Sequence, residues 1–208
     1  KVFDLVSRVT RFERLNCYNA PSGANGLRSM NIDPPAILVG ADMQRSVGMK
    51  VLAFSISKLL FLMTPHALMA TLDVDYESRR NRLKVIIFTL MRMAGLDINE
   101  FDEGLLDIYQ RRVDNTDLNT INTLLNEMQL DQRTHLDVSR WLEGLDHTAN
   151  RLGFLVCNDL NEAIQAIRNA MVIMSRASIA ARIQALILFS ISEEYFALRK
   201  GLGISIRV

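Results

Sequence analysis

The apolar run Val51–Met63, VLAFSISKLLFLM, constrains the fold of this chain most. A helix that crosses a bilayer needs about twenty apolar residues. This run is only thirteen residues long, and Ser57 and Lys58 interrupt it. Pro65 ends it, because proline cannot continue the hydrogen-bond ladder of a helix. Helical spacing is kept by Val51, Phe54, Leu59 and Leu62. The run therefore predicts a buried helix and no transmembrane segment.

The rest of the chain predicts a mainly α fold with a small β element, an α+β class. Two extended runs, Leu15–Tyr18 and Ala36–Val39, flank a region rich in turn residues and predict two short strands joined by a long connection. Everything after Asp42 has a helical pattern. The helices expected are about 76–94, a short one within 97–117, about 116–130, a long one whose core stripe is Val138, Trp141, Leu145, Ala149, Leu152 and Val156, one that starts after Asp159, and a last one over about 177–200.

Length and composition suggest how the chain is organised. Its 208 residues suit a single globular domain, expected to span 1–208. It starts with neither a methionine nor a signal-peptide pattern, so we expect a C-terminal fragment of a longer chain. Apolar residues make up 49%, which is high for a solvated monomer. We therefore expect a protein partner, or the missing N-terminal region of the same chain, to cover part of the surface.

Charge and cysteine content exclude several classes of function. The 24 basic and 23 acidic residues leave no excess positive charge for phosphates, which argues against a nucleic-acid partner. The two cysteines, Cys17 and Cys157, lack the CxxC spacing of a zinc ribbon and do not form a disulfide framework. Reduced thiols fit a cytoplasmic location.

Three segments, in order, resemble the gluzincin metallopeptidases that include the CAAX prenyl endoprotease and the HtpX-type bacterial membrane proteases. The segments are CYNAPSGANGL…PPAILVGADM, MKVLAFSISKLLFLMTPH and LDHTANRLGFLVCNDLNEAIQAI. They are similar to that family's strands, to its helix with His-Glu-x-x-His, and to its later helix with a third ligand. The segments ANRLGFLVCNDL and LFSISEEYFALRKGLGI also resemble an uncharacterised C-terminal domain of bacterial tetratricopeptide-repeat proteins.

The resemblance implies a zincin-like helical core that lacks its metal site. A zinc helix needs two histidines four residues apart on one face, with a carboxylate beside the first. The resemblance puts Ser57 and Phe61 at the histidine positions, Lys58 at the glutamate, Asp146 at the third ligand and Asn150 at its supporting aspartate, while Arg151 and Gly153 match the family. Such residues imply no metal, no cofactor and no catalytic residue. The expected function is that of a pseudoenzyme, a non-catalytic structural or protein-interaction domain in a larger assembly.

Several of these residues have a simpler interpretation as well. Lys58 is either a solvated side chain on a core helix or an ammonium that pairs with Asp146 in place of zinc. The histidines His66, His135 and His147 do not have the spacing of one helix face and give little support for a relocated metal site. Ser57 and Lys58 are adjacent on a helix, so their side chains diverge and do not form a serine–lysine nucleophile.

Two surface segments leave alternatives open. Arg79, Arg80, Arg82 and Lys84 form either a solvated helix face or a docking patch for a neighbour or anionic lipid. Tyr195, Phe196 and Leu198 are expected to pack in the core, with an interaction helix as the alternative. The rival functions are a hydrolase or metallopeptidase with an unorthodox site, and a peripheral module at a membrane surface.

Overall fold

The structure is a computed structural model, and it describes residues 6, 9, 16–21, 25–30, 32, 34, 36–45, 47–71, 75–127, 137–170 and 174–204. It has the expected class, mainly α with one small sheet. Contacts divide the chain into two compact units. The first comprises Lys1–Leu72 and Glu143–Val208, and the second Asp73–Leu142.

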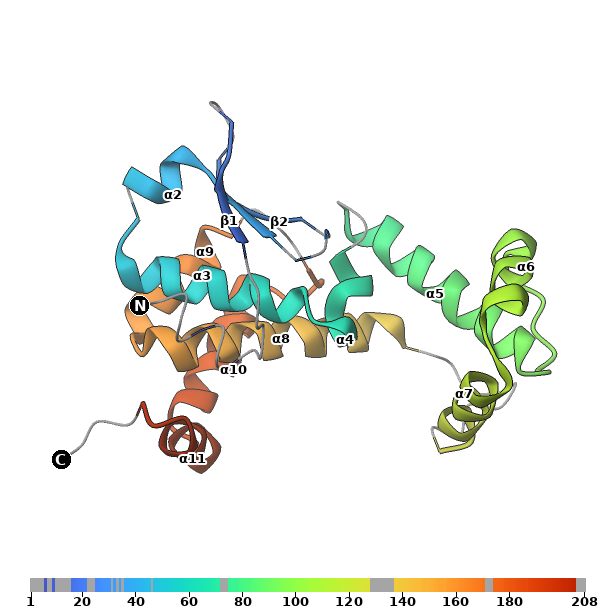
Figure 1. Cartoon of the computed structure of the whole chain (residues 1–208). Helices are drawn as coiled ribbons and strands as arrows, with labels where there is room; N and C mark the ends of the chain where they lie inside the picture. The colour runs from blue at the N-terminus through green and yellow to red at the C-terminus, as the bar shows by residue number, and fades with distance from the viewer. Residues whose placement is uncertain are drawn as a thin grey trace. The chain divides into compact units, whose positions relative to one another are not determined.

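The sheet of the first unit has three short strands in the order β1-β3-β2 (Figure 1). The strands are β1 (Asn16–Asn19), β2 (Leu27–Met30) and β3 (Ala36–Val39). Central β3 is parallel to β1 and antiparallel to β2. The sequence predicts β1 and β3, whereas β2 falls within the predicted connection. Its segment, LRSM, has little strand pattern of its own and is a strand because it pairs with β3.

The apolar run of the sequence is helix α3 (Met49–Leu62), as predicted. Short α2 (Ala41–Arg45) precedes it, and α4 (Pro65–Leu68) and the 3₁₀ turn η1 (Met69–Thr71) follow. Pro65 is the first residue of α4, where its missing N–H costs nothing. The predicted stop of the long helix is therefore also the start of the next one.

Helix α3 is central to the first unit because two of its faces are buried. Ile56 and Leu60 pack with Ile37 of the sheet, while Ala53 and Phe54 pack with residues of four further helices. The four helices are α8 (Val138–Cys157), α9 (Leu160–Arg168), α10 (Ile179–Ser190) and α11 (Glu193–Gly201). Side chains on α3 therefore have little access to solvent except at its start.

The predicted stripe of α8 is confirmed at Val138 and Ala149, which are buried, and at Leu152 and Val156, which pack against the core, but it is wrong at Trp141. Trp141 was placed in the core but is 40% exposed, while its neighbour Leu142 is fully buried. The prediction followed apolar residues only, whereas two buried positions of α8, Asp146 and Asn150, are polar. An apolar pattern does not include these two polar positions, so it gave no indication that the buried side of α8 contains Leu142 rather than Trp141. The expected cap of α9 is confirmed, since Asp159 accepts a hydrogen bond from the Glu162 amide at 3.1 Å.

The prediction of one last helix was wrong, because the chain forms α10 and α11 with a break between them. The break is explained by Ser192, whose hydroxyl accepts a hydrogen bond from the Tyr195 amide at 3.2 Å and caps α11. Glu193 and Glu194 in the first turn of α11 also favour a helix start, because their negative charges interact favourably with the positive end of the helix dipole. These local preferences end α10 and start a new helix within the predicted range 177–200.

The second unit consists of α5 (Tyr76–Met93), α6 (Glu103–Arg112) and α7 (Asn115–Glu127). These ranges confirm the three helices expected in this part of the chain. Asp75 and Asp102 cap α5 and α6 through the amides of Ser78 and Leu105. The amide of Asp102 also donates to Thr89 Oγ1 at 3.2 Å, which joins the start of α6 to α5.

Candidate functional site

The candidate site depends on a close approach between α3 and α8. A Cβ atom on Gly153 would lie 2.8 Å from the ring of Phe54, a distance that real Cβ contacts do not show. Only a glycine lets the two helices pack this closely with that ring between them. One turn further along α3 from Phe54 is Lys58, and one turn back along α8 from Gly153 is Asn150. The glycine thus helps to bring these polar residues together.

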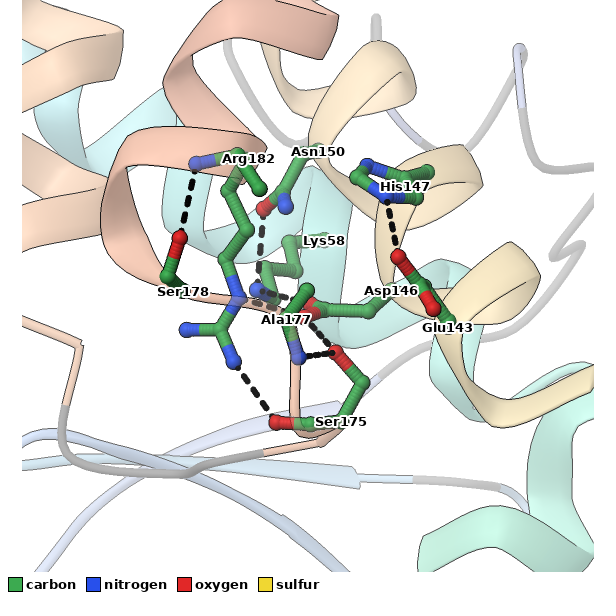
Figure 2. A network of polar contacts seen from close by, with 10 residues as sticks. Lys58, Glu143, Asp146, His147, Asn150, Ser175, Ala177, Ser178 and Arg182 are labelled. Atoms are coloured by element: carbon green, nitrogen blue, oxygen red, sulfur yellow. Dashed lines mark hydrogen bonds and ion pairs between the residues drawn. The ribbon is translucent and has the colours of Figure 1, made fainter. Parts of the chain in front are cut away.

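Lys58 reaches from α3 to α8 and binds two side chains there (Figure 2). Its Nζ atom lies 2.9 Å from Asp146 Oδ1 and 2.9 Å from Asn150 Oδ1. The Lys58 side chain is 15% exposed and that of Asp146 only 1%. The alternative in which Lys58 pairs with Asp146 is therefore confirmed, and Lys58 is not simply a solvated residue.

The second oxygen of Asp146 binds the C-terminal part of the chain. Oδ2 accepts a hydrogen bond from Ser175 Oγ at 3.0 Å and lies 2.8 Å from Arg182 Nε, an ion pair without a well-aligned hydrogen bond. Arg182 also donates from Nη2 to the carbonyl oxygen of Ser175 at 2.9 Å. One carboxylate thus joins α3, α8, the segment before α10 and α10 itself. We call Lys58, Asp146, Asn150, Ser175 and Arg182 the Asp146 network.

Sequence reasoning missed two members of the Asp146 network, Ser175 and Arg182. Ser175 belongs to no motif and lies 29 residues from its partner Asp146. The only available indication was Arg182 itself, a basic residue within the mostly apolar ARIQALILFS of α10. A cation in such a helix requires a partner, but the sequence does not say which one.

The electrostatics of the network favour an ionised carboxylate. Burial raises the pKa of Asp146, but the charge of Lys58, its hydrogen bond and the charge of Arg182 lower it, and the pKa lies below the ordinary value. Two cations flank a single anion, so the cluster keeps a net positive charge. The amide of Asn150 contributes an uncharged acceptor for Lys58.

A depressed pKa predicts how the stability of the protein depends on pH. Because the folded pKa of Asp146 is below its unfolded value of about 3.9, its contribution to stability is complete above that value. It is lost as the pH falls through the folded pKa. We expect the free energy of unfolding of the native protein to exceed that of Asp146→Asn at pH 7, and the difference to shrink below about pH 4. Urea denaturation between pH 2.5 and 7 measures it, and a difference independent of pH contradicts the assignment.

The other residues at predicted site positions have ordinary structural roles. The Ser57 hydroxyl donates to the Ala53 carbonyl of its own helix at 2.7 Å and is buried, which fits the expected absence of a serine–lysine pair. His147 lies 3.5 Å from Glu143 on α8. The side chain of His66 and the whole of His135 lie outside the described residues. Within the described ranges, no three histidine, cysteine or acidic side chains are grouped so that they could hold a metal.

The residues at the positions of the implied zinc site do not fit that metal. Phe61 has no donor atom, and the Ser57 hydroxyl is bound to its own backbone. Both oxygens of Asp146 are bound by cationic or hydroxyl donors. An ammonium within hydrogen-bond distance of the only carboxylate repels any further cation. No step of metal chemistry follows from these residues.

The proposed basic docking patch needs correction. Arg79 is 1% exposed and cannot belong to a surface patch. Arg80 lies 3.4 Å from Glu77 and Lys84 lies 2.6 Å from Glu100, so acidic neighbours balance part of the charge. Arg82 is exposed. The run of charged residues gave no indication that Arg79 is buried, because helical spacing alone does not tell which face of α5 packs against other residues.

Within the part of the chain that the structure describes, every helix is too short or too polar to cross a bilayer. Comparisons with protein-family models, with curated proteins and with solved structures gave no match. The resemblance to gluzincin metallopeptidases therefore stays a prediction that depends on the three quoted segments.

Proposed function

We propose that this chain is a non-catalytic domain with a zincin-like helical core, which serves as a structural or protein-interaction part of a larger assembly. The observation that carries the proposal is the contact of Lys58 with Asp146 and Asn150. These are the positions at which the resemblance implies a catalytic carboxylate, a metal ligand and its support. An ammonium and its partners take the place of a reactive centre.

The Asp146 network supports a structural role because it cross-links elements that are distant in sequence. A zinc ion in a protein holds its ligands' helices together by binding each of them. Here one carboxylate binds Lys58 on α3 and Arg182 on α10, and so gives the same kind of connection without a metal. Buried ion pairs add little net stability, but they penalise arrangements in which a charge is left unpaired. The network therefore favours one packing of these helices.

Exposed apolar side chains support an interaction role. Ile191 is 71% exposed, Met49 65% and Leu188 59%. Exposed single apolar residues are common on protein surfaces, whereas contiguous exposed apolar patches are typical of interaction sites. Leu188 and Ile191 are three residues apart at the end of α10. A protein partner, or a preceding part of the same polypeptide, is the occupant that we propose for such surfaces.

The proposal is tested by metal analysis and a peptidase assay on protein purified without chelators. We expect well under one zinc per chain and no hydrolysis of peptide substrates, because the donor set is incomplete and carries positive charge. One equivalent of tightly bound zinc overturns the non-catalytic assignment. Zinc-dependent peptide cleavage overturns it as well.

A variant with restored ligands tests the metallopeptidase derivation separately. Ser57→His, Lys58→Glu, Phe61→His and Asp146→Glu together recreate two histidines and two glutamates at the implied positions. We expect this variant to take up one zinc per chain, whereas the same variant without Phe61→His binds it at least tenfold more weakly. A folded variant that takes up no zinc contradicts the derivation and leaves the result on the native protein unaffected.

A further inference from the structure

Helix α11 carries a stripe of three outward residues, Glu193, Phe196 and Lys200. Their spacing of three and four places them on one face of the helix. Phe196 is 60% exposed and both charged residues are exposed, while Tyr195 and Arg199 are on the buried side. Core packing was expected for Tyr195, Phe196 and Leu198, and only Tyr195 shows it. We call Glu193, Phe196 and Lys200 the Phe196 stripe.

The buried side of α11 holds the helix firmly in place. The Tyr195 ring stacks on Phe154 with ring centroids 4.8 Å apart, and its hydroxyl donates to Asn158 Oδ1 at 2.6 Å. Arg199 donates from Nη1 to the carbonyl oxygen of Leu155 at 2.9 Å. A surface on a fixed helix loses little conformational entropy on binding. The Phe196 stripe is therefore preorganised for a partner.

The Phe196 stripe is complementary to itself. At 1.5 Å per residue, Glu193 lies about 4.5 Å before Phe196 along the axis and Lys200 about 6 Å after it. When two copies of α11 run antiparallel, the two phenyl rings meet and each Glu193 lies opposite the other copy's Lys200. An interface about a two-fold axis requires such a self-complementary patch. The stripe has no net charge, so it does not favour a strongly acidic or basic partner such as an anionic membrane.

We infer that the partner of this surface is a second copy of the chain, with α11 packed antiparallel on α11 about a two-fold axis near Phe196. This inference is independent of the proposed function, since any protein could carry such a surface. A contact built on a nine-residue helix is smaller than a standard interface of about 800 Å² per partner. The dimer is therefore weak, with Kd in the range of about 10 μM to 1 mM.

Sedimentation equilibrium of the full chain, from about 10 μM to 2 mM, tests the inference. We expect a reversible dimer whose Kd rises at least tenfold in Phe196→Glu. The matched control is Leu198→Glu, which places the same charge on the other flank of α11, where Leu198 is 42% exposed. It should change Kd less than threefold. A native chain that is monomeric throughout, or two substitutions with equal effects, overturns the inference.

Charge reversal tests the antiparallel arrangement itself. Glu193→Lys and Lys200→Glu each place like charges opposite one another in their own homodimers, and each should weaken self-association by about three- to tenfold. In an equimolar mixture, each variant supplies the charge that the other lacks, so a heterodimer with nearly the native Kd should form. If mixing restores nothing, the two copies do not pair in this way. Near-UV circular dichroism confirms that each variant is folded.

Discussion

Asp146→Leu is expected to lower the free energy of unfolding by about 3–5 kcal/mol. The substitution removes the only anion of the Asp146 network and leaves Lys58 and Arg182 without their charged partner. The Arg182 side chain is 7% exposed, so water cannot replace the lost contact. Urea denaturation at pH 7, with circular dichroism as the signal, measures the change.

Variants of the two cations make this prediction specific. Lys58→Met alone should cost less, about 1.5–3 kcal/mol, because Arg182 and Ser175 still bind the carboxylate. The triple variant Lys58→Met/Asp146→Leu/Arg182→Met should recover most of the stability lost in Asp146→Leu, since it leaves no buried charge unpaired. The double variant Lys58→Met/Asp146→Leu, which keeps Arg182, should recover only part of the lost stability. If the triple variant is no more stable than Asp146→Leu, the unpaired charges of the Asp146 network do not cause the loss of stability.

The elements of the fold were predictable where a local pattern and tertiary packing agree. Local pattern and tertiary packing both favour a helix for the apolar run before Pro65, and both also favour a helix for α5. The errors occur where the two disagree. Strand β2 depends on pairing with β3, and the break before α11 depends on a serine cap within an apolar pattern. Neither the strand pairing nor the serine cap can be recognised from the average composition of its segment.

The candidate site was predictable only in part, for a related reason. The pair Lys58–Asp146 followed from the resemblance, since nothing in the local sequence links residues 88 positions apart. Ser175 and Arg182 lie outside the quoted motifs, so the second half of the Asp146 network could not be inferred. The burial of Arg79 could not be inferred from the sequence either. A charged residue in a charged run gives no indication that it faces the interior.

Gly153→Val is expected to lower the free energy of unfolding by about 3 kcal/mol, at the upper end of overpacking effects. The new side chain would occupy the space of the Phe54 ring, whose nearest atom is 2.8 Å from an ideal Cβ. The backbone of α8 or of α3 has to move, because the ring is buried among other core residues. Chemical denaturation measures this loss.

Another glycine in the same helix provides the control. A Cβ on Gly144 meets nothing within 4 Å, so Gly144→Ala should stabilise the protein by about 0.5–1 kcal/mol through helix propensity alone. Shortening the opposing ring in Phe54→Leu/Gly153→Val should restore part of the stability if the clash is the cause.

The same substitution connects packing to the candidate site. Separating α3 from α8 at Gly153 lengthens the path from Lys58 to Asp146, and a weaker ion pair lowers the carboxyl pKa less. We therefore expect the pKa of Asp146, followed by NMR of its side-chain carboxyl carbon, to rise in Gly153→Val and to stay unchanged in Gly144→Ala. An unchanged pKa in both variants would mean that the Asp146 network keeps its geometry without the close approach at Gly153.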